Sequence, residues 1–124
     1  MSYRRKAIGR LGEQIAESYL KTSGYRIIER NYRCPVGEID LIAEEKGILA
    51  FVEVRTLSSR NWGLPQMSIN FSKRQKIVKT SLYYLSQTNM WDRICRFDIV
   101  AVILQTETEE QQVELLRGAF EALN

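Results

Sequence analysis

Two carboxylates lie where core side chains would be expected: Asp40 in the apolar run 37–44 and Glu53 in the apolar run 48–56. An unpaired carboxylate is expensive to bury. If the two runs form a hairpin with a two-residue turn at Lys46 and Gly47, Asp40 lies opposite Glu53, and like charges in that position are destabilising. Mg²⁺ is commonly held by one or two carboxylates together with water and phosphate oxygens. The pair is therefore a candidate site for a shared divalent cation, which would polarise a phosphate or activate a water.

Two other arrangements of these acids remain open. A three-residue connection would shift the register and send the two side chains to opposite faces of the hairpin. Alternatively, both acids could lie on a solvated face, with Arg55 paired to one of them. Ile42, Leu49 and Phe51 share the proposed face with the acids, and this argues against simple solvation.

The amino-acid composition limits the catalytic and metal-binding chemistry that is open to this chain. The chain has 124 residues, which fits one domain (1–124), and it contains no histidine. Ser-His-Asp and Cys-His catalysis and a Cys/His zinc site are therefore excluded. Cys34 and Cys95 belong to no C-x-x-C pair and are expected to be plain buried thiols. A catalytic site would have to use carboxylates, Lys or Arg, and a metal held by oxygen ligands.

Charge and hydropathy indicate the compartment and the partner. The net charge is +3, a weak indication of a polyanionic partner. No run reaches the ~20 apolar residues that span a membrane. The N-terminal residues contain no apolar segment typical of a secretory signal. We therefore expect a cytoplasmic protein.

Hydrophobic periodicity predicts an α/β fold. The stripe Ile8, Leu11, Ile15 and Tyr19 predicts an amphipathic helix over 4–22. A second helix should begin near Ser72, which forms an S-x-x-Q capping box with Gln75. Alternating apolar runs predict strands at 25–33, 37–44, 48–56, 93–104 and 113–120, with a long polar loop at 57–70. The predicted order is α-β-β-β-α-β-β, a central mixed β-sheet flanked by helices.

The predicted second helix has basic residues near its N-terminus, where positive charge is unfavourable. Lys73, Arg74 and Lys76 fall in its first turns, where the helix dipole is already positive. A bound phosphate would compensate for this charge, and a solvated basic face is the alternative. In the long loop, Arg60 suits a phosphate contact, whereas Trp62 could stack on a base or pack on the domain.

The motifs together resemble a known family. "GEIDLIA" followed by "FVEVR" resembles the split D…E-x-K core of the PD-(D/E)XK nuclease superfamily. More specifically, the chain resembles the YraN-like family of predicted endonucleases, which are related in fold to archaeal Holliday-junction resolvases. The segments "GRLGEQIAESYLKTSGYRIIERNYR", "WGLP", "SKRQKI" and "RFDIVAV" extend the likeness over residues 8 to 120. The resemblance implies a restriction-endonuclease-like fold.

The resemblance also implies a site. Asp40 and Glu53 would bind Mg²⁺ or Mn²⁺, and Glu13 would complete the metal site. Arg55 stands where the superfamily has Lys; it can hold a phosphate oxygen but is a poor base. The implied nucleic-acid contacts are Arg10, Arg60, Lys73, Arg74, Gln75 and Lys76.

Two functions follow from this site. The first is a metal-dependent endonuclease that hydrolyses phosphodiester bonds, with DNA as the expected substrate and branched DNA as an analogy with the resolvases. The second is a catalytically inactive nucleic-acid-binding module of the same fold, which Arg55 favours. Asp98 is left out of the site because Arg96 or Arg93 could pair with it. A homodimer is a further expectation, since the apolar edge segment "VELL" could pair across a two-fold axis.

Overall fold

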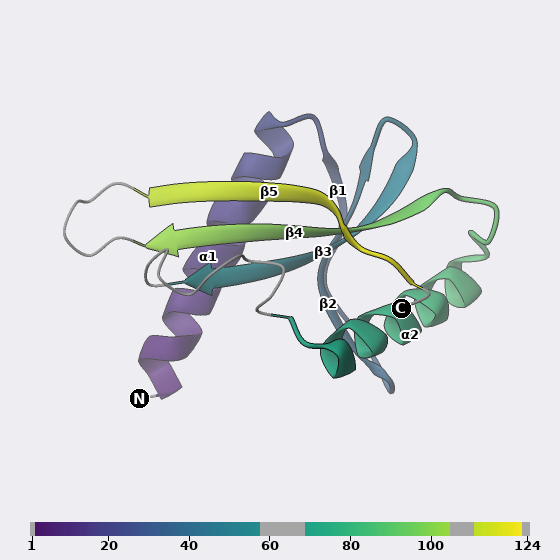
Figure 1. Cartoon of the computed structure of the whole chain (residues 1–124), viewed down its shortest axis with the longest axis horizontal. Helices are drawn as coiled ribbons and strands as arrows, with labels where there is room; N and C mark the ends of the chain where they lie inside the picture. The colour runs from purple at the N-terminus through teal and green to yellow at the C-terminus, as the bar shows by residue number, and fades with distance from the viewer. Residues whose placement is uncertain (1, 58–68, 105–110, 123–124) are drawn as a thin grey trace.

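The computed structural model describes residues 2–57, 69–104 and 111–122. Its elements are α1 (Ser2–Thr22), β1 (Arg26–Cys34), β2 (Gly37–Glu45), β3 (Ile48–Leu57), α2 (Phe71–Thr88), β4 (Cys95–Leu104) and β5 (Gln111–Phe120). The five strands form one sheet in the order β1-β2-β3-β4-β5. β3 and β4 are parallel, and the other neighbours are antiparallel. The predicted α/β order and the mixed sheet are thus confirmed (Figure 1).

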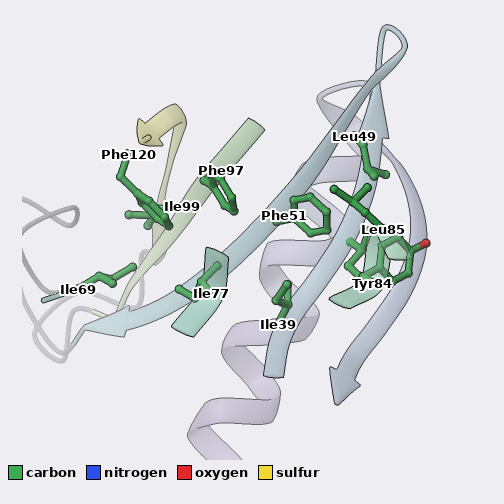
Figure 2. Close-up of a cluster of buried hydrophobic side chains, with 11 residues drawn as sticks. Ile39, Leu49, Phe51, Ile69, Ile77, Tyr84, Leu85, Phe97, Ile99 and Phe120 are labelled. Atoms are coloured by element: carbon green, nitrogen blue, oxygen red, sulfur yellow. The ribbon is translucent and has the colours of Figure 1, made fainter. Parts of the chain in front are cut away.

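The two helices cover opposite faces of the sheet, and each face has its own apolar core (Figure 1). Ile77, Tyr84 and Leu85 of α2 pack on one face, where they meet the aromatic and aliphatic side chains shown in Figure 2. Ala16 and Leu20 of α1 pack on the other face. No helix in the described ranges is long and apolar enough to cross a membrane.

The β2–β3 hairpin has the predicted two-residue turn. Lys46 and Gly47 both have positive φ angles, 51° and 82°, as a type I′ turn requires. The Cα pairing begins at Glu45 and Ile48. The register that brings Asp40 and Glu53 together is therefore the one that forms.

α1 does not bury the predicted stripe. Ile8, Leu11 and Tyr19 are 36%, 43% and 38% exposed, and Ile15 is only half-buried. The neighbouring flank, which contains Ala16 and Leu20, is buried instead. The helix is amphipathic as predicted, but the prediction of which apolar stripe packs on the sheet was wrong.

Gly12 explains which face of α1 packs on the sheet. A Cβ atom built at Gly12 would lie 2.0 Å from Oγ1 of Thr56 in β3. Small side chains at Gly12 and Ala16 let the helix approach the sheet closely, whereas the longer side chains of the predicted stripe would hold it away. This contact also places Glu13 at the border between the helix and the sheet.

The N-cap of α2 is Asn70 rather than Ser72. The helix begins at Phe71, and the side-chain oxygen of Asn70 accepts a hydrogen bond from the backbone N–H of Lys73 at 2.9 Å. The predicted start of the helix was close, but the capping box of Ser72 and Gln75 was wrong, because Asn is an equally good cap and lies two residues earlier.

Candidate metal and nucleic-acid site

Asp40 and Glu53 lie where β2 separates from β3. The regular pairing of the two strands ends at Leu41 and Val52, the pair just before the two acids. Beyond it the backbone N–H of Val54 donates a hydrogen bond to Oδ2 of Asp40, at 2.8 Å, in place of a ladder carbonyl. The separation of the strands thus opens a gap, and the Asp40 carboxylate is fixed in it.

Glu53 is buried beside this carboxylate. Its neighbour Phe51 points into the α2-side core, and strand alternation turns Glu53 the same way. Only 7% of Glu53 is exposed. Burial raises its pKa to about 9, assisted by the hydrogen bond to Asp40 and the charge of Asp40. The surroundings of the pair thus favour a proton on Glu53 over two charged carboxylates side by side.

Two nearby cations favour the charged form of Glu53. Nζ of Lys73 lies 3.9 Å from Oε1 of Glu53. Arg55, two residues further along the same face of β3, is half-buried, and its charge also lowers the pKa of Glu53. Neither effect prevents the large upward shift of that pKa.

A cleft of about 470 Å³ opens over Glu53, between the end of the hairpin and the first turns of α2. Its walls are Val36, Gly37, Glu38, Asp40, Glu53, Asn70, Ser72, Lys73, Lys76 and Ile77. The first turn of α2 contains no acidic residue. The positive helix end and two lysines thus share one cleft with three acids, Glu38, Asp40 and Glu53, a combination suited to a phosphate beside a metal ion.

Asp40 also lines a second cleft of about 470 Å³, on the α1 side. Arg10 and Glu13 belong to this cleft, together with Arg30 of β1. Burial raises the pKa of Glu13, and the charges of Asp40 and Glu38 raise it further. The hairpin acids therefore affect the pKa of Glu13, although Glu13 and Glu53 lie in different clefts on either side of Asp40.

The oxygen atoms available at this site suit a cation that binds only one or two protein side chains. Asp40 and Glu53 offer hard carboxylate oxygens, and a bound cation would displace the proton that Glu53 otherwise keeps. In residues 2–57, 69–104 and 111–122, no three Asp, Glu, Cys or His side chains are grouped to hold one metal ion. Glu13 thus does not form the predicted three-acid cluster with the strand acids, because Asp40 stands between its cleft and that of Glu53. One or two carboxylates completed by water and phosphate oxygens is the usual arrangement for Mg²⁺.

Only some of the other residues predicted to contact nucleic acid line the cleft of Glu53. Lys73 and Lys76 line the cleft of Glu53, whereas Arg74 and Gln75 do not. Nε of Arg74 donates to the carbonyl of Ile69 at 2.9 Å, and its guanidinium lies 5.6 Å from the centre of the Phe120 ring. Gln75 lies beside Arg74 and the C-terminal residues on another side of α2. Arg60 and Trp62 fall outside the described residues.

The cleft also contains groups that sequence reasoning missed. Asn70 and Ser72 line it, and the backbone N–H of Val54 holds Asp40. An Asn directly before a predicted helix could have identified the cap. Nothing in the local sequence indicates the contact of Val54, because it depends on the strands separating.

A second group of buried acids lies elsewhere in the molecule. Asp98 of β4 is fully buried and accepts hydrogen bonds from Tyr25 Oη at 2.7 Å, Arg96 Nε at 2.8 Å and the backbone N–H of Gly118 at 2.9 Å. The predicted pairing of Asp98 with Arg96 is confirmed. This acid belongs to a closed network rather than to a cleft.

The fold and the site define a class of protein: a small α/β domain with paired carboxylates at the open end of its central hairpin, facing a basic helix N-terminus. The chain belongs to the uncharacterised protein family UPF0102, whose profile matches residues 12–102. The predicted resemblance is thus confirmed at the level of this family.

Relatives cover almost the whole chain. A UPF0102 protein from Moorella thermoacetica is 45% identical over 97% of this chain and 100% of its own length. One from Desulfosudis oleivorans is 46% identical over 98% and 96%, and one from Clostridium botulinum is 43% identical over 98% and 99%. The fold and site described above therefore fall within a segment that these relatives share end to end.

Proposed function

We propose that this protein is a metal-dependent nuclease of the restriction-endonuclease-like class, which hydrolyses phosphodiester bonds in nucleic acid, with DNA as the expected substrate. The observation that carries the proposal is the buried Glu53 carboxyl beside Asp40, at the floor of an open cleft. Two buried carboxylates side by side are unfavourable, so without a cation Glu53 keeps its proton, whereas a divalent cation would stabilise both charged forms.

Asp40 and Glu53 would hold Mg²⁺ or Mn²⁺, and the hydrogen bond from Val54 keeps Asp40 oriented. When bound, the cation supplies a Lewis acid that polarises phosphate oxygens and lowers the pKa of water. Glu13, from the α1 side, adds negative charge next to Asp40. In the reaction, a water loses one proton to the solvent and its oxygen bonds to phosphorus, one P–O ester bond breaks, and the departing oxygen takes up one proton from the solvent.

Cations of the chain would position the substrate. Lys73 and Lys76 face the cleft at the N-terminus of α2 and would bind backbone phosphates there. Arg55 lies on the same strand face as Glu53 and would hold an oxygen of the scissile phosphate, where a fixed guanidinium stabilises charge but does not accept a proton. Arg10 in the second cleft would extend the path of the backbone on the other side of Asp40.

A second candidate is a nucleic-acid-binding module without catalytic activity. Arg55 favours it, because the superfamily motif that the hairpin resembles has Lys at this position. Such a module would bind DNA through Lys73 and Lys76 but would have no requirement for a divalent cation. The two candidates therefore differ in metal dependence and not in DNA binding.

The test is a cleavage assay on single-stranded, duplex and branched DNA, with Mg²⁺, Mn²⁺ or a chelator. Wild type is compared with the near-isosteric variants Asp40→Asn and Glu53→Gln. Glu44→Gln is the matched control, because Glu44 is an acid of the same strand that pairs with Arg26 and Arg93 away from the cleft. We expect metal-dependent cleavage that falls on the order of a thousandfold in both site variants and is unchanged in the control.

Two outcomes would decide against the nuclease. Cleavage that survives in both site variants would show that the carboxylate pair is not the catalytic site. DNA binding without cleavage of any substrate, and equal with metal or chelator, would establish the binding module instead.

A further inference from the structure

α2 has an unbalanced positive charge. Its 18 residues, Phe71–Thr88, include four basic side chains and no acidic one. Since the net charge of the whole chain is +3, the rest of the chain has a net charge of −1. On the neighbouring strand β1, each arginine is paired with a glutamate. In the described part of the chain, by contrast, no carboxylate lies within ion-pair distance of Lys76 or Lys79.

One flank of α2 continues from the cleft of Glu53. Ser72 and Lys76 line that cleft. Lys79 and Tyr83 follow on the same flank, because all four side chains fall within about 60° of one another around the helix axis at 100° per residue. The first three are exposed, and Tyr83 is half-buried. This strip, here called the α2 track, is about 16 Å long at a rise of 1.5 Å per residue.

The α2 track runs along the border between α2 and β1. The helix lies over the β1–β2 side of the sheet (Figure 1). A Cβ atom built at Gly37, at the start of β2, would lie 2.9 Å from Oγ1 of Thr80. Further along the helix, Oη of Tyr32 in β1 donates a hydrogen bond to Oε1 of Gln87 at 3.5 Å. The opposite flank of α2, at Leu82, lines an apolar cleft against β4 and β5, so the track lies away from that cleft.

The far end of the α2 track has aromatic side chains. Tyr83 lies near Tyr32 of β1: burial raises the pKa of Tyr32, and the charges of Cys34 and then of Tyr83 raise it further. Both tyrosines are half-buried, so both keep some exposed surface. The charge of Glu29 also raises the pKa of Tyr32, so negative charge lies at this end as well. A bound polyanion is therefore expected to end its ionic contacts at Lys79 and to meet an aromatic surface at Tyr83.

We propose that the α2 track binds an unpaired strand of nucleic acid that continues from the phosphate in the cleft of Glu53. Lys76 at the cleft and Lys79 beyond it contact backbone phosphates of this strand, and Tyr83 stacks on one of its bases. A basic strip that leads to an aromatic side chain is typical of single-strand binding, because an unpaired base can turn its face to an aromatic ring. This inference rests on the proposed function only in that nucleic acid occupies the cleft.

The shape of the cleft favours one strand over two. Glu53 at its floor is only 7% exposed, and the cleft has Val36 and Gly37 of the β1–β2 connection on one side and the first turns of α2 on the other. A single strand can pass between these walls and turn along α2. A base-paired strand brings its partner strand with it and leaves no base free for Tyr83. The α2 track therefore distinguishes an unpaired strand from a duplex.

The test is binding of the full chain, in a chelator, to a fluorescent single strand of DNA and to the same strand annealed as a blunt duplex. Fluorescence anisotropy over a range of salt concentrations measures it. Lys79→Gln is compared with Lys46→Gln, the same loss of charge at an exposed lysine in the β2–β3 turn. For the single strand, we expect Lys79→Gln to reduce the slope of log K against log salt by about 0.7, the value for one phosphate contact, and Lys46→Gln to leave it unchanged. For the duplex, which is expected to contact only the cleft, the two variants should behave alike.

The contact of Tyr83 is tested through its ring. Tyr83→Phe keeps a stacking surface and should bind the single strand as wild type does, whereas Tyr83→Leu should bind it roughly tenfold more weakly. Tyr19→Leu is the matched control, because Tyr19 is a 38% exposed tyrosine of α1, on the other face of the sheet. Thermal melts check that each variant is folded, and the exposed position of Lys79 makes its variant independent of packing around Tyr83.

Several outcomes would overturn the α2 track. These are equal salt slopes for wild type and Lys79→Gln on the single strand, an equal loss for Lys79→Gln on single strand and duplex, or unchanged single-strand binding by folded Tyr83→Leu. Each of them leaves the proposed function standing, because metal-dependent cleavage and its loss in Asp40→Asn and Glu53→Gln are measured separately. A wild type that binds no nucleic acid would overturn both the α2 track and the proposed function.

Discussion

The molecule buries acids in two regions, the Asp40–Glu53 pair in the cleft and the Asp98–Glu45 network at the other end of the hairpin. In the network, Asp98 is held by Arg96, and Glu45 accepts hydrogen bonds from Arg96 at 2.7 Å and from Nε of Arg117 at 2.8 Å. Each of these two carboxylates is therefore paired with at least one guanidinium group. In the cleft, two carboxylates meet each other, and Lys73 approaches Glu53 only to 3.9 Å.

The electrostatic consequences have opposite signs. The hydrogen bonds from Arg117 lower the pKa of Glu45 to about 2, so this acid stabilises the fold as a carboxylate. Burial and Asp40 raise the pKa of Glu53 to about 9, so this acid destabilises the fold when it is charged. A buried acid thus indicates a binding site only where the protein leaves its charge unbalanced.

The largest expected effect on stability comes from breaking the balanced network. Asp98→Asn removes the charge that Arg96 needs, and breaking a buried ion pair costs about 3–5 kcal/mol. Urea unfolding at neutral pH measures this loss. Asp92→Asn, an exposed acid in the α2–β4 connection, is the control and should change the free energy of unfolding by less than about 0.5 kcal/mol. An equally small effect at Asp98 would contradict the structural role of the network.

An effect of opposite sign, smaller for each pH unit, is expected in the cleft. The folded metal-free protein keeps a proton on Glu53 that the unfolded chain releases above its ordinary pKa of 4.5. Stability from this group is therefore complete below about pH 4.5 and is lost as pH rises toward 9, by at most about 1.4 kcal/mol per pH unit.

Glu53→Gln should remove this slope and raise the melting temperature at pH 8. Thermal melts in a chelator from pH 5 to pH 9 measure it. The matched variant Glu45→Gln should lower the melting temperature at neutral pH, because the pKa of Glu45 is depressed and its contribution disappears only as pH falls from about 4.5 to about 2. Parallel curves for wild type and Glu53→Gln would mean that Glu53 is not the buried proton carrier.

The smallest expected effect concerns the cations of the two regions. Lys76→Ala should reduce the slope of log K against log salt for duplex DNA by about 0.9, the value for one phosphate contact, and leave unfolding unchanged. Arg117→Ala should do the reverse, because Arg117 is engaged with Glu45. Filter-binding or anisotropy titrations over a range of salt concentrations separate the two. Equal slopes for wild type and Lys76→Ala would remove the cleft from the nucleic-acid path.

Much of the fold could be predicted because its signals are local. A Lys-Gly pair between apolar runs favours a two-residue turn, and the structure forms that turn with the register that brings Asp40 to Glu53. The predictions of the helix cap and of the buried helix face failed because more than one residue, or more than one face, could fill the same structural role. Asn70 and Ser72 are both acceptable caps, and helix periodicity alone does not distinguish a stripe of long apolar side chains from a flank of small ones.

The sequence by itself determined the order of the elements and the presence of acids within apolar strands, since these depend on neighbouring residues, whereas the structure selected the hairpin register among those left open. Only the tertiary structure decided which acids are balanced. Asp98 takes its proton donor from Tyr25, 73 positions away, and Glu45 takes its guanidinium from Arg117, 72 positions away. The pKa of Glu53 is raised because Glu53 is buried beside Asp40, where the strands separate, and that separation is a property of the packed sheet rather than of the hairpin sequence.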